Sequence, residues 1–249
     1  MENPLISILP GPEEAATEAA GYLLDILLRA VEMRGCSRLV LAGGSTPRRL
    51  YALLAAEPFR ARFLGARTHL FWTDERAVGT DHAESNYRMA HETFLQKMDI
   101  PEGNIHRMRG EALDLDQAAR DYETEIRQHF KLTSDASPPS FDLVLLGLGV
   151  DGHTASLFPR TTALQETVRW VVPHRTTLDR ITLTLPILNQ AERILFLVCG
   201  EEKANILAEL FLGRSDTVPA GRIRPVIGSV RWIMDRAAAR RLQVGGVQC

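Results

Sequence analysis

Short apolar runs alternate along this chain with segments whose apolar residues recur at helical spacing. Apolar runs of about four to eight residues are typical of buried strands, and apolar residues at i, i+3 and i+4 are typical of amphipathic helices. The runs that we expect to be strands are residues 5–9, 38–42, 68–72, 141–146, 168–172, 181–185, 194–198 and 230–234. The expected helices are residues 13–33, 47–56, 86–97, 115–130 and 201–211, with a short helix near the end of the chain. This alternation predicts an α/β sandwich around a mostly parallel sheet.

The length of 249 residues fits one large domain or two small ones, at ~100–200 residues per domain. The most linker-like piece, residues 134–140, leads straight into a strongly apolar strand, so we interpret it as a surface loop. We therefore expect residues 1–249 to form a single domain.

The charge and the cysteines restrict the class of protein. A formal net charge of −2 argues against bulk attraction to nucleic acid or to an anionic membrane, although a small basic pocket is compatible with it. Cys36, Cys199 and Cys249 show no C-x-x-C spacing, which argues against a disulfide framework and a thiolate zinc site. The first four residues lack the basic start of a signal peptide, and no apolar stretch approaches the ~20 residues of a membrane span. We expect a cytoplasmic protein with no nucleic-acid, membrane or obligate protein partner.

Three unusual loops directly follow expected strands, where α/β folds bind their ligands. In the first, Gly43 and Gly44 allow a sharp turn, Ser45 and Thr46 offer hydroxyl groups, and Pro47 suits the first position of a helix. Backbone N–H groups at that helix start would bind an anion, most simply a phosphate. The alternative is an ordinary strand-to-helix turn with an N-cap, and the loop alone does not decide between them.

The second loop, residues 147–154, contains G-x-G-x-x-G and ends in polar residues. A dinucleotide site is disfavoured because no acidic residue ends the next expected strand and because Asp151, His153 and Thr154 are too polar for a pyrophosphate loop. His153 follows Asp151 by two residues, and an imidazole with its unperturbed pKa of roughly 6.5 can act as a general base. The alternative is that His153 caps a following helix.

The third loop carries Asp74, Glu75 and Arg76 directly after an apolar strand. It is either a solvated loop or part of a site, in which Arg76 would bind a carboxylate or carbonyl oxygen with its planar guanidinium. Ser85 and Asn86 are interpreted as surface residues that cap the next helix. No G-x-S-x-G or H-E-x-x-H occurs, and His82 and His91 are too far apart to pair on one helical face, so we expect no metal and no serine nucleophile.

Taken together, these loops resemble the 6-phosphogluconolactonase family over residues 5–240. The matching segments are LAGGSTP at 41–47, WTDER at 72–76, SNY at 85–87, GLGVDGHTASLFP at 147–159, RITLTLP at 180–186 with Asn189, and GEEKA at 200–204. The string DGHTASLFP is the most specific of them. The resemblance implies a Rossmann-like three-layer α/β/α sandwich, as in glucosamine-6-phosphate deaminases and ribose-5-phosphate isomerase.

The resemblance also implies an activity and a site. The activity is hydrolysis of 6-phospho-D-glucono-1,5-lactone to 6-phospho-D-gluconate in the pentose phosphate pathway, without cofactor. His153 would be the general base and Arg76 would contact the lactone end, while Asp74 and Asp151 would shape the polar floor and orient His153 or water. The residues implied for the substrate phosphate are Gly43, Gly44, Ser45, Thr46, Arg180 and Lys203.

Three other functions remain as alternatives. A deaminase of amino-sugar phosphates is disfavoured because the chain has His-Thr-Ala-Ser-Leu-Phe-Pro after the glycine loop and Arg76 after Glu75. A non-catalytic sugar-phosphate sensor would usually carry an additional module, for which the chain has no spare length. A dinucleotide-dependent oxidoreductase would depend only on Gly147, Gly149 and Gly152.

Overall fold

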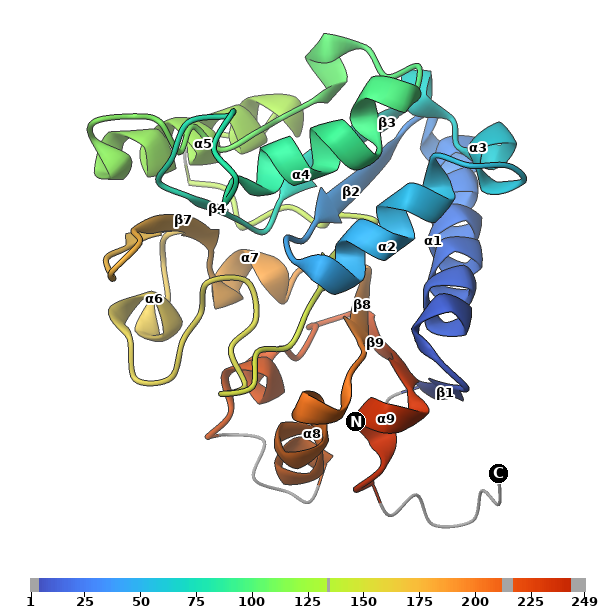
Figure 1. The fold of residues 1–249 in the computed structure, drawn as a ribbon. Coiled ribbons are helices and arrows are strands. Elements are labelled where there is room, and N and C mark those ends of the chain that lie inside the picture. The colour runs from blue at the N-terminus through green and yellow to red at the C-terminus, as the bar shows by residue number, and fades with distance from the viewer. Residues whose placement is uncertain (1–4, 134, 212–216, 243–249) are drawn as a thin grey trace.

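The computed structural model describes residues 5–133, 135–211 and 217–242 (Figure 1). The N-terminal residues 1–4 and Cys249, which entered the expectations above, lie outside this range. The strands are β1 (Leu5–Leu9), β2 (Ser37–Leu41), β3 (Thr68–Trp72), β4 (Asp74–Arg76), β5 (Leu143–Leu146), β6 (Val171–His174), β7 (Arg180–Leu183), β8 (Arg193–Val198) and β9 (Ser229–Asp235). The α-helices are α1 (Pro12–Arg34), α2 (Ser45–Leu54), α3 (Phe59–Arg62), α4 (Asn86–Thr93), α5 (Leu115–His129), α6 (Thr162–Gln165), α7 (Leu185–Leu188), α8 (Ala204–Phe211) and α9 (Arg236–Ala239).

Six strands form the main sheet in the order β1-β9-β8-β5-β2-β3, and all of its strand pairs are parallel. Alternate residues of each strand point to opposite faces, and both faces are covered. Leu39 and Leu41 of β2 pack with α1, α2 and α4, whereas Val40 packs with α5, α7 and α8. Figure 1 shows α1 and α2 on one side of this sheet and α7 on the other. The expected three-layer α/β/α sandwich is therefore confirmed.

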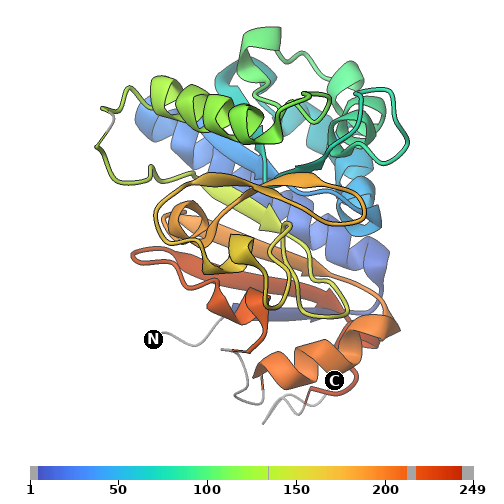
Figure 2. The same ribbon diagram turned by 90° about the vertical axis from the view of Figure 1, so that its left-hand side faces the viewer.

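A second, smaller sheet departs from the expectation. β4, β7 and β6 pair antiparallel in the order β4-β7-β6, and β6 and β7 lie in front of the main sheet in Figure 2. The expected strands 168–172 and 181–185 thus contribute to this sheet rather than to the parallel one, and both are displaced. Residues 167–169 form a turn because their N–H groups bond the Glu166 carboxylate, so β6 begins only at Val171.

Local sequence explains where the long helices begin and end. Helix α1 has Pro12 in its first turn and ends at Gly35, whose φ of 79° favours glycine. The Asp114 carboxylate accepts the N–H of Gln117 and caps α5, as expected. Helix α4 stops at Thr93 and continues as a 3₁₀ turn over Leu95–Lys97. Within the described residues, no helix has both the length and the hydrophobicity to cross a bilayer.

Two buried tyrosines fix the carboxyl ends of neighbouring strands. The Tyr51 hydroxyl accepts the N–H of Ala42, just beyond β2, and donates to the carbonyl of the same residue. The Tyr122 hydroxyl accepts the N–H of Trp72, the last residue of β3, and donates to the His106 carbonyl. Burial raises the pKa of both phenols, so both hydroxyl groups keep their protons. The loops after β2 and β3 therefore start from fixed positions.

Candidate active site

A cleft of about 370 Å³ lies beyond the carboxyl ends of β2, β5 and β8, within the range of roughly 300–1,000 Å³ typical of small-molecule sites. It brings together residues from all three loops singled out in the sequence, together with Arg180 of β7 and with Glu202 and Lys203 from the segment before α8. The expected site residues that line it are Gly43, Gly44, Ser45, Thr46, Asp74, Arg76, His153, Arg180 and Lys203. The remaining expected site residue, Asp151, is not among the residues that line the cleft but contacts the His153 imidazole.

The glycine loop opens α2 into the cleft without a side-chain cap. Gly44 precedes the helix with a φ of 107°, and no side chain bonds its first turn. The backbone N–H groups of Ser45 and Thr46 have no acceptor within the described residues. The side-chain N-cap that the alternative of an ordinary turn would provide is absent from the described part of the chain, and Pro47 is the third helical residue rather than the first. Unbonded N–H groups at the positive end of a helix dipole suit an anion.

The His153 loop folds back on itself rather than leading into a helix. Gly149 N–H donates to the His153 carbonyl at 2.8 Å, and the Thr154 hydroxyl donates to the Gly147 carbonyl at 2.9 Å. The next helix, α6, begins much later and is capped by Thr161. His153 is therefore not a helix cap. The glycines also lack the following helix that a dinucleotide-binding loop requires.

The Asp151 carboxylate holds the imidazole of His153. Asp151 Oδ1 lies 2.5 Å from His153 Nδ1 and also accepts the backbone N–H of His153 at 3.1 Å. Burial raises the pKa of Asp151, but these hydrogen bonds outweigh it and leave the pKa below its usual value. An ionised acceptor at Nδ1 places the ring proton there and leaves the Nε2 lone pair available, since Nε2 bonds no described residue.

Two further contacts fix the plane of this ring. The Phe158 ring stacks on the imidazole with 4.2 Å between centroids. Gly149 also packs closely against the ring, because a Cβ added there would lie 2.1 Å from His153 Nδ1, so only glycine fits at position 149. Of the two aspartates considered above, Asp151 is therefore the one that contacts His153, and Asp74 bonds other partners.

Asp74 belongs to the network around Arg180. Asp74 is buried; its Oδ2 accepts the Ser156 hydroxyl at 2.6 Å and lies 3.7 Å from Arg180 Nη1. Burial lowers the pKa of Arg180, Asp74 opposes this shift, and Arg76 adds to it by repulsion. Ser156 was part of the recognised motif, but the sequence did not assign it this contact.

Arg76 and Arg180 present partly unsatisfied guanidinium groups. Arg76 Nη1 donates to the Glu84 carbonyl and to Asn86 Oδ1, at 2.6 and 2.7 Å. The Nε groups of Arg76 and Arg180 are both buried, and neither has a partner within the described residues. Buried donors without partners are uncommon in folded proteins, so a site for an anion is a natural explanation.

Asn86 is the main cleft residue that the sequence analysis placed wrongly. It is 1% exposed, not on the surface, and its Nδ2 donates to the Asp74 carbonyl at 2.8 Å. Ser85, also buried, caps α4 as expected by accepting the N–H of Arg88. Glu75 is buried behind them and accepts the N–H groups of Asn86 and Tyr87, so it positions the start of α4 rather than facing ligand. No local sequence signal places Asn86 in the cleft, because its contact with Asp74 bridges twelve residues.

The sequence analysis expected no metal in this chain and weighed only His82 and His91 as a histidine pair. Three other histidines, His69, His106 and His129, do lie together, but none of them lines the cleft.

Comparison with known proteins gives a consistent family. A family model described as glucosamine-6-phosphate isomerases/6-phosphogluconolactonase matches residues 10–232. A 6-phosphogluconolactonase of Synechocystis sp. is 39% identical over 96% of this chain and 99% of its own length. A 6-phosphogluconolactonase of Rattus norvegicus is 36% identical over 96% of this chain and 94% of its own. The solved structure of 6-phosphogluconolactonase from Trypanosoma cruzi superposes with a TM-score of 0.85 at 30% identity, covering 97% of each chain.

Proposed function

This chain belongs to the family of glucosamine-6-phosphate isomerases and 6-phosphogluconolactonases, and from that premise we propose that it hydrolyses 6-phospho-D-glucono-1,5-lactone to 6-phospho-D-gluconate with His153 as general base. Within the family it is an enzyme of the hydrolase branch. The observation that carries the proposed mechanism is the cleft itself, where a histidine fixed by an aspartate shares the lining with Arg76, Arg180 and Lys203 and with the uncapped start of α2.

The phosphate end of the substrate takes the positive side of the cleft. The uncapped start of α2, with Ser45 and Thr46, supplies backbone and hydroxyl donors. Lys203 and Arg180, which also line the cleft, add positive charge. A phosphate dianion bound here would offset the electrostatic repulsion between Arg180 and Arg76.

The lactone carbonyl then lies near His153. The neutral imidazole removes a proton from water through Nε2 while the water oxygen bonds the carbonyl carbon. Negative charge on the former carbonyl oxygen is stabilised by the Arg76 guanidinium. As the tetrahedral intermediate collapses, the bond from carbon to the ring oxygen breaks and the imidazolium returns its proton to that oxygen. The product is an open-chain acid, and no covalent enzyme intermediate or metal is needed.

The Asp151 carboxylate contributes by stabilising the imidazolium and by keeping the proton on Nδ1. Asp74, Ser156 and Asn86 hold the two arginines in place and are positioning residues. Fixing both ends of the substrate contributes to the rate by orientation, because the reacting carbon is then held near the base.

The direct test mixes the protein with freshly prepared 6-phosphogluconolactone and follows acid release in a pH-stat against the spontaneous background. The proposal predicts release that is proportional to enzyme concentration and unaffected by chelator. A parallel assay for ammonia release from glucosamine 6-phosphate tests the isomerase branch of the family. Ammonia release without lactone hydrolysis would overturn the proposal, as would substrate binding without turnover.

A further inference from the structure

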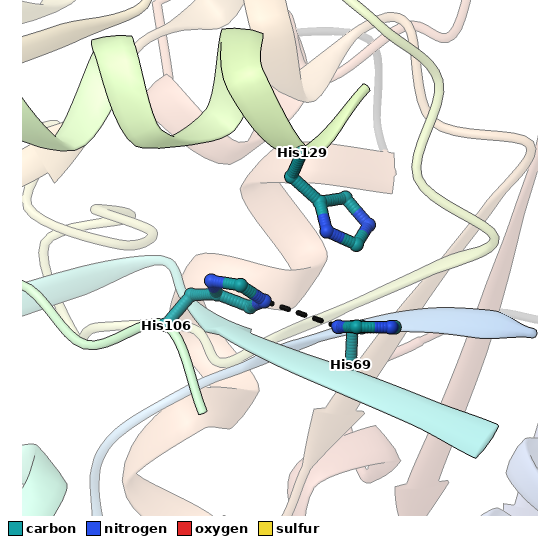
Figure 3. A group of neighbouring side chains, drawn as sticks. All are labelled: His69, His106 and His129. Atoms are coloured by element: carbon teal, nitrogen blue, oxygen red, sulfur yellow. Dashed lines mark hydrogen bonds between the residues drawn. The ribbon is translucent and has the colours of Figure 1, made fainter. Parts of the chain in front are cut away.

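Three histidines far apart in the sequence meet on the side of the main sheet covered by α5. His69 lies in β3, His106 in the loop that runs alongside β3, and His129 at the end of α5 (Figure 3). Each offers one ring nitrogen, and these three nitrogens all lie within 4.8 Å of one another. We propose that His69, His106 and His129 form a binding site for a transition-metal ion of the Zn²⁺ type, separate from the catalytic cleft.

Two of the three nitrogens already have the spacing of metal ligands. His69 Nδ1 lies 3.1 Å from His106 Nε2. Two nitrogens bound tetrahedrally to zinc at ~2.0–2.1 Å lie about 3.3 Å apart, so the distance of this pair already fits, and the two rings have to turn only until both lone pairs point to the metal. The third nitrogen has to approach by roughly 1–1.5 Å, which rotation of the His129 ring can supply.

The surroundings of His106 are those of a metal ligand. Its Nδ1 lies 2.7 Å from Glu125 Oε1, which fixes the proton on Nδ1 and leaves the Nε2 lone pair directed at His69. Such a carboxylate behind a ligating histidine raises its basicity and is a common feature of zinc sites. The Phe71 ring stacks on His106 with 4.4 Å between centroids and 10° between planes, and this contact also restricts the orientation of the imidazole.

All three rings can present a lone pair after one proton shift. His69 now donates from Nδ1 to His106, and on binding metal it would carry its proton on Nε2 instead. That transfer can pass through solvent because His69 is only partly buried.

Arg38 opposes binding of the metal. Its Nε donates to His129 Nε2 at 3.2 Å. If Nε2 ligates, its lone pair is no longer available to Arg38; if Nδ1 ligates, Nε2 has to carry the proton. The hydrogen bond is lost in either case, and the guanidinium repels the cation as well. Removing Arg38 should therefore increase the affinity for the metal. If the histidine cluster has only a structural role, the metal affinity should not change.

The experiment titrates the chelator-stripped protein with Co²⁺ and reads the visible bands of tetrahedral cobalt, then measures the thermal midpoint in Zn²⁺. The proposal predicts tetrahedral bands, and a rise in the midpoint of about 5–10 °C when zinc is one hundred times Kd. His69→Ala and His129→Ala should weaken binding at least ~100-fold, and Glu125→Ala about 10–100-fold.

Arg38→Met should tighten binding about tenfold, while Arg60→Met, at an exposed arginine of α3, should leave it unchanged. His91→Ala and His153→Ala should also bind cobalt as the wild type does, which separates this site from the surface histidine and from the cleft. Absence of tetrahedral bands in the wild-type protein would overturn the proposal. Bands that persist in His69→Ala and His129→Ala, or an affinity unchanged in Arg38→Met, would overturn it as well.

Discussion

Arg76 and Arg180 lie directly opposite each other in the antiparallel pairing of β4 and β7, although both are cations. Like charges in opposite positions of a sheet are destabilising, so the fold tolerates this pair at a cost. Both side chains line the cleft, and Asp74 is the one carboxylate within salt-bridge distance of Arg180 among the described residues. The pairing is explained if both arginines contact the same bound sugar phosphate, Arg180 at its phosphate group and Arg76 at its lactone carbonyl.

Replacing Arg180 should therefore weaken binding of the phosphorylated substrate. Charge-assisted hydrogen bonds contribute ~1.5–3 kcal/mol, so Arg180→Met should raise KM by about 10–100-fold. Inorganic phosphate should raise the thermal midpoint of the wild-type protein and should do so much less in this variant. Arg60→Met is the matched control, and a KM equal to that of the wild type in Arg180→Met would remove Arg180 from the phosphate site.

The two glycines of the His153 loop should respond differently to the same added carbon. Gly149→Ala places a Cβ 2.1 Å from His153 Nδ1, and the ring has to move away from Asp151. Since displacement of a base by ~1 Å can cost about 100-fold in rate, kcat should fall by about that factor. Gly147→Ala adds a Cβ that meets no protein atom within 4 Å, and its kcat should remain near the wild-type value. Equal kcat values in the two variants would contradict the proposed position of the base.

Asp151→Asn tests the aspartate behind the base. The low pKa of Asp151 keeps its carboxylate ionised through the whole pH range in which an imidazole titrates. The neutral amide no longer stabilises the imidazolium, so protonation of the base should require more acid. We expect kcat to fall at least ~10-fold and the acid limb of the kcat/KM profile to move to lower pH. A profile measured between pH 4 and 9 that keeps its position would assign Asp151 a structural role only.

His69 and His129, which are partly buried, should make the metal-free protein sensitive to acid. Burial, His69, His106 and Arg38 all depress the pKa of His129, to about 3, and burial depresses that of His69 to about 4. The unfolded chain binds these protons near pH 6.5, so the stabilising contribution is complete above that pH and is lost as pH falls towards 4. In EDTA, the thermal midpoint should drop over this interval, and His129→Phe should flatten the drop. A midpoint that is constant from pH 6.5 to 4 would contradict this account.

Sequence patterns predicted most of the fold because the parallel sheet is built from continuous apolar runs. The positions of the strands and of the loops that follow them are predicted by local signals such as Gly43 and the apolar residues of β5. The small antiparallel sheet was missed because Asp74, Glu75 and Arg76 have the composition of a loop. They form a strand only because β7, about one hundred residues later, supplies the partner groups.

The site was predictable to the extent that it is local. His153 and Asp151 are two residues apart, and their pairing follows from the loop. Asn86 contacts Asp74 across a long connection, which no local pattern shows. The three-histidine cluster is a product of tertiary packing. Within α5, the sequence shows only that Glu125 and His129 are four residues apart and so share one face of the helix.

The most direct test of the account is the steady-state kinetics of His153→Ala on fresh 6-phosphogluconolactone, corrected for spontaneous hydrolysis. Loss of general-base assistance should lower kcat by about 10²–10⁴-fold, while the affinity for 6-phosphogluconate, measured by calorimetry, stays within about threefold of the wild-type value. A variant that keeps its kcat and loses affinity would show that His153 binds substrate and that another group removes the proton from water.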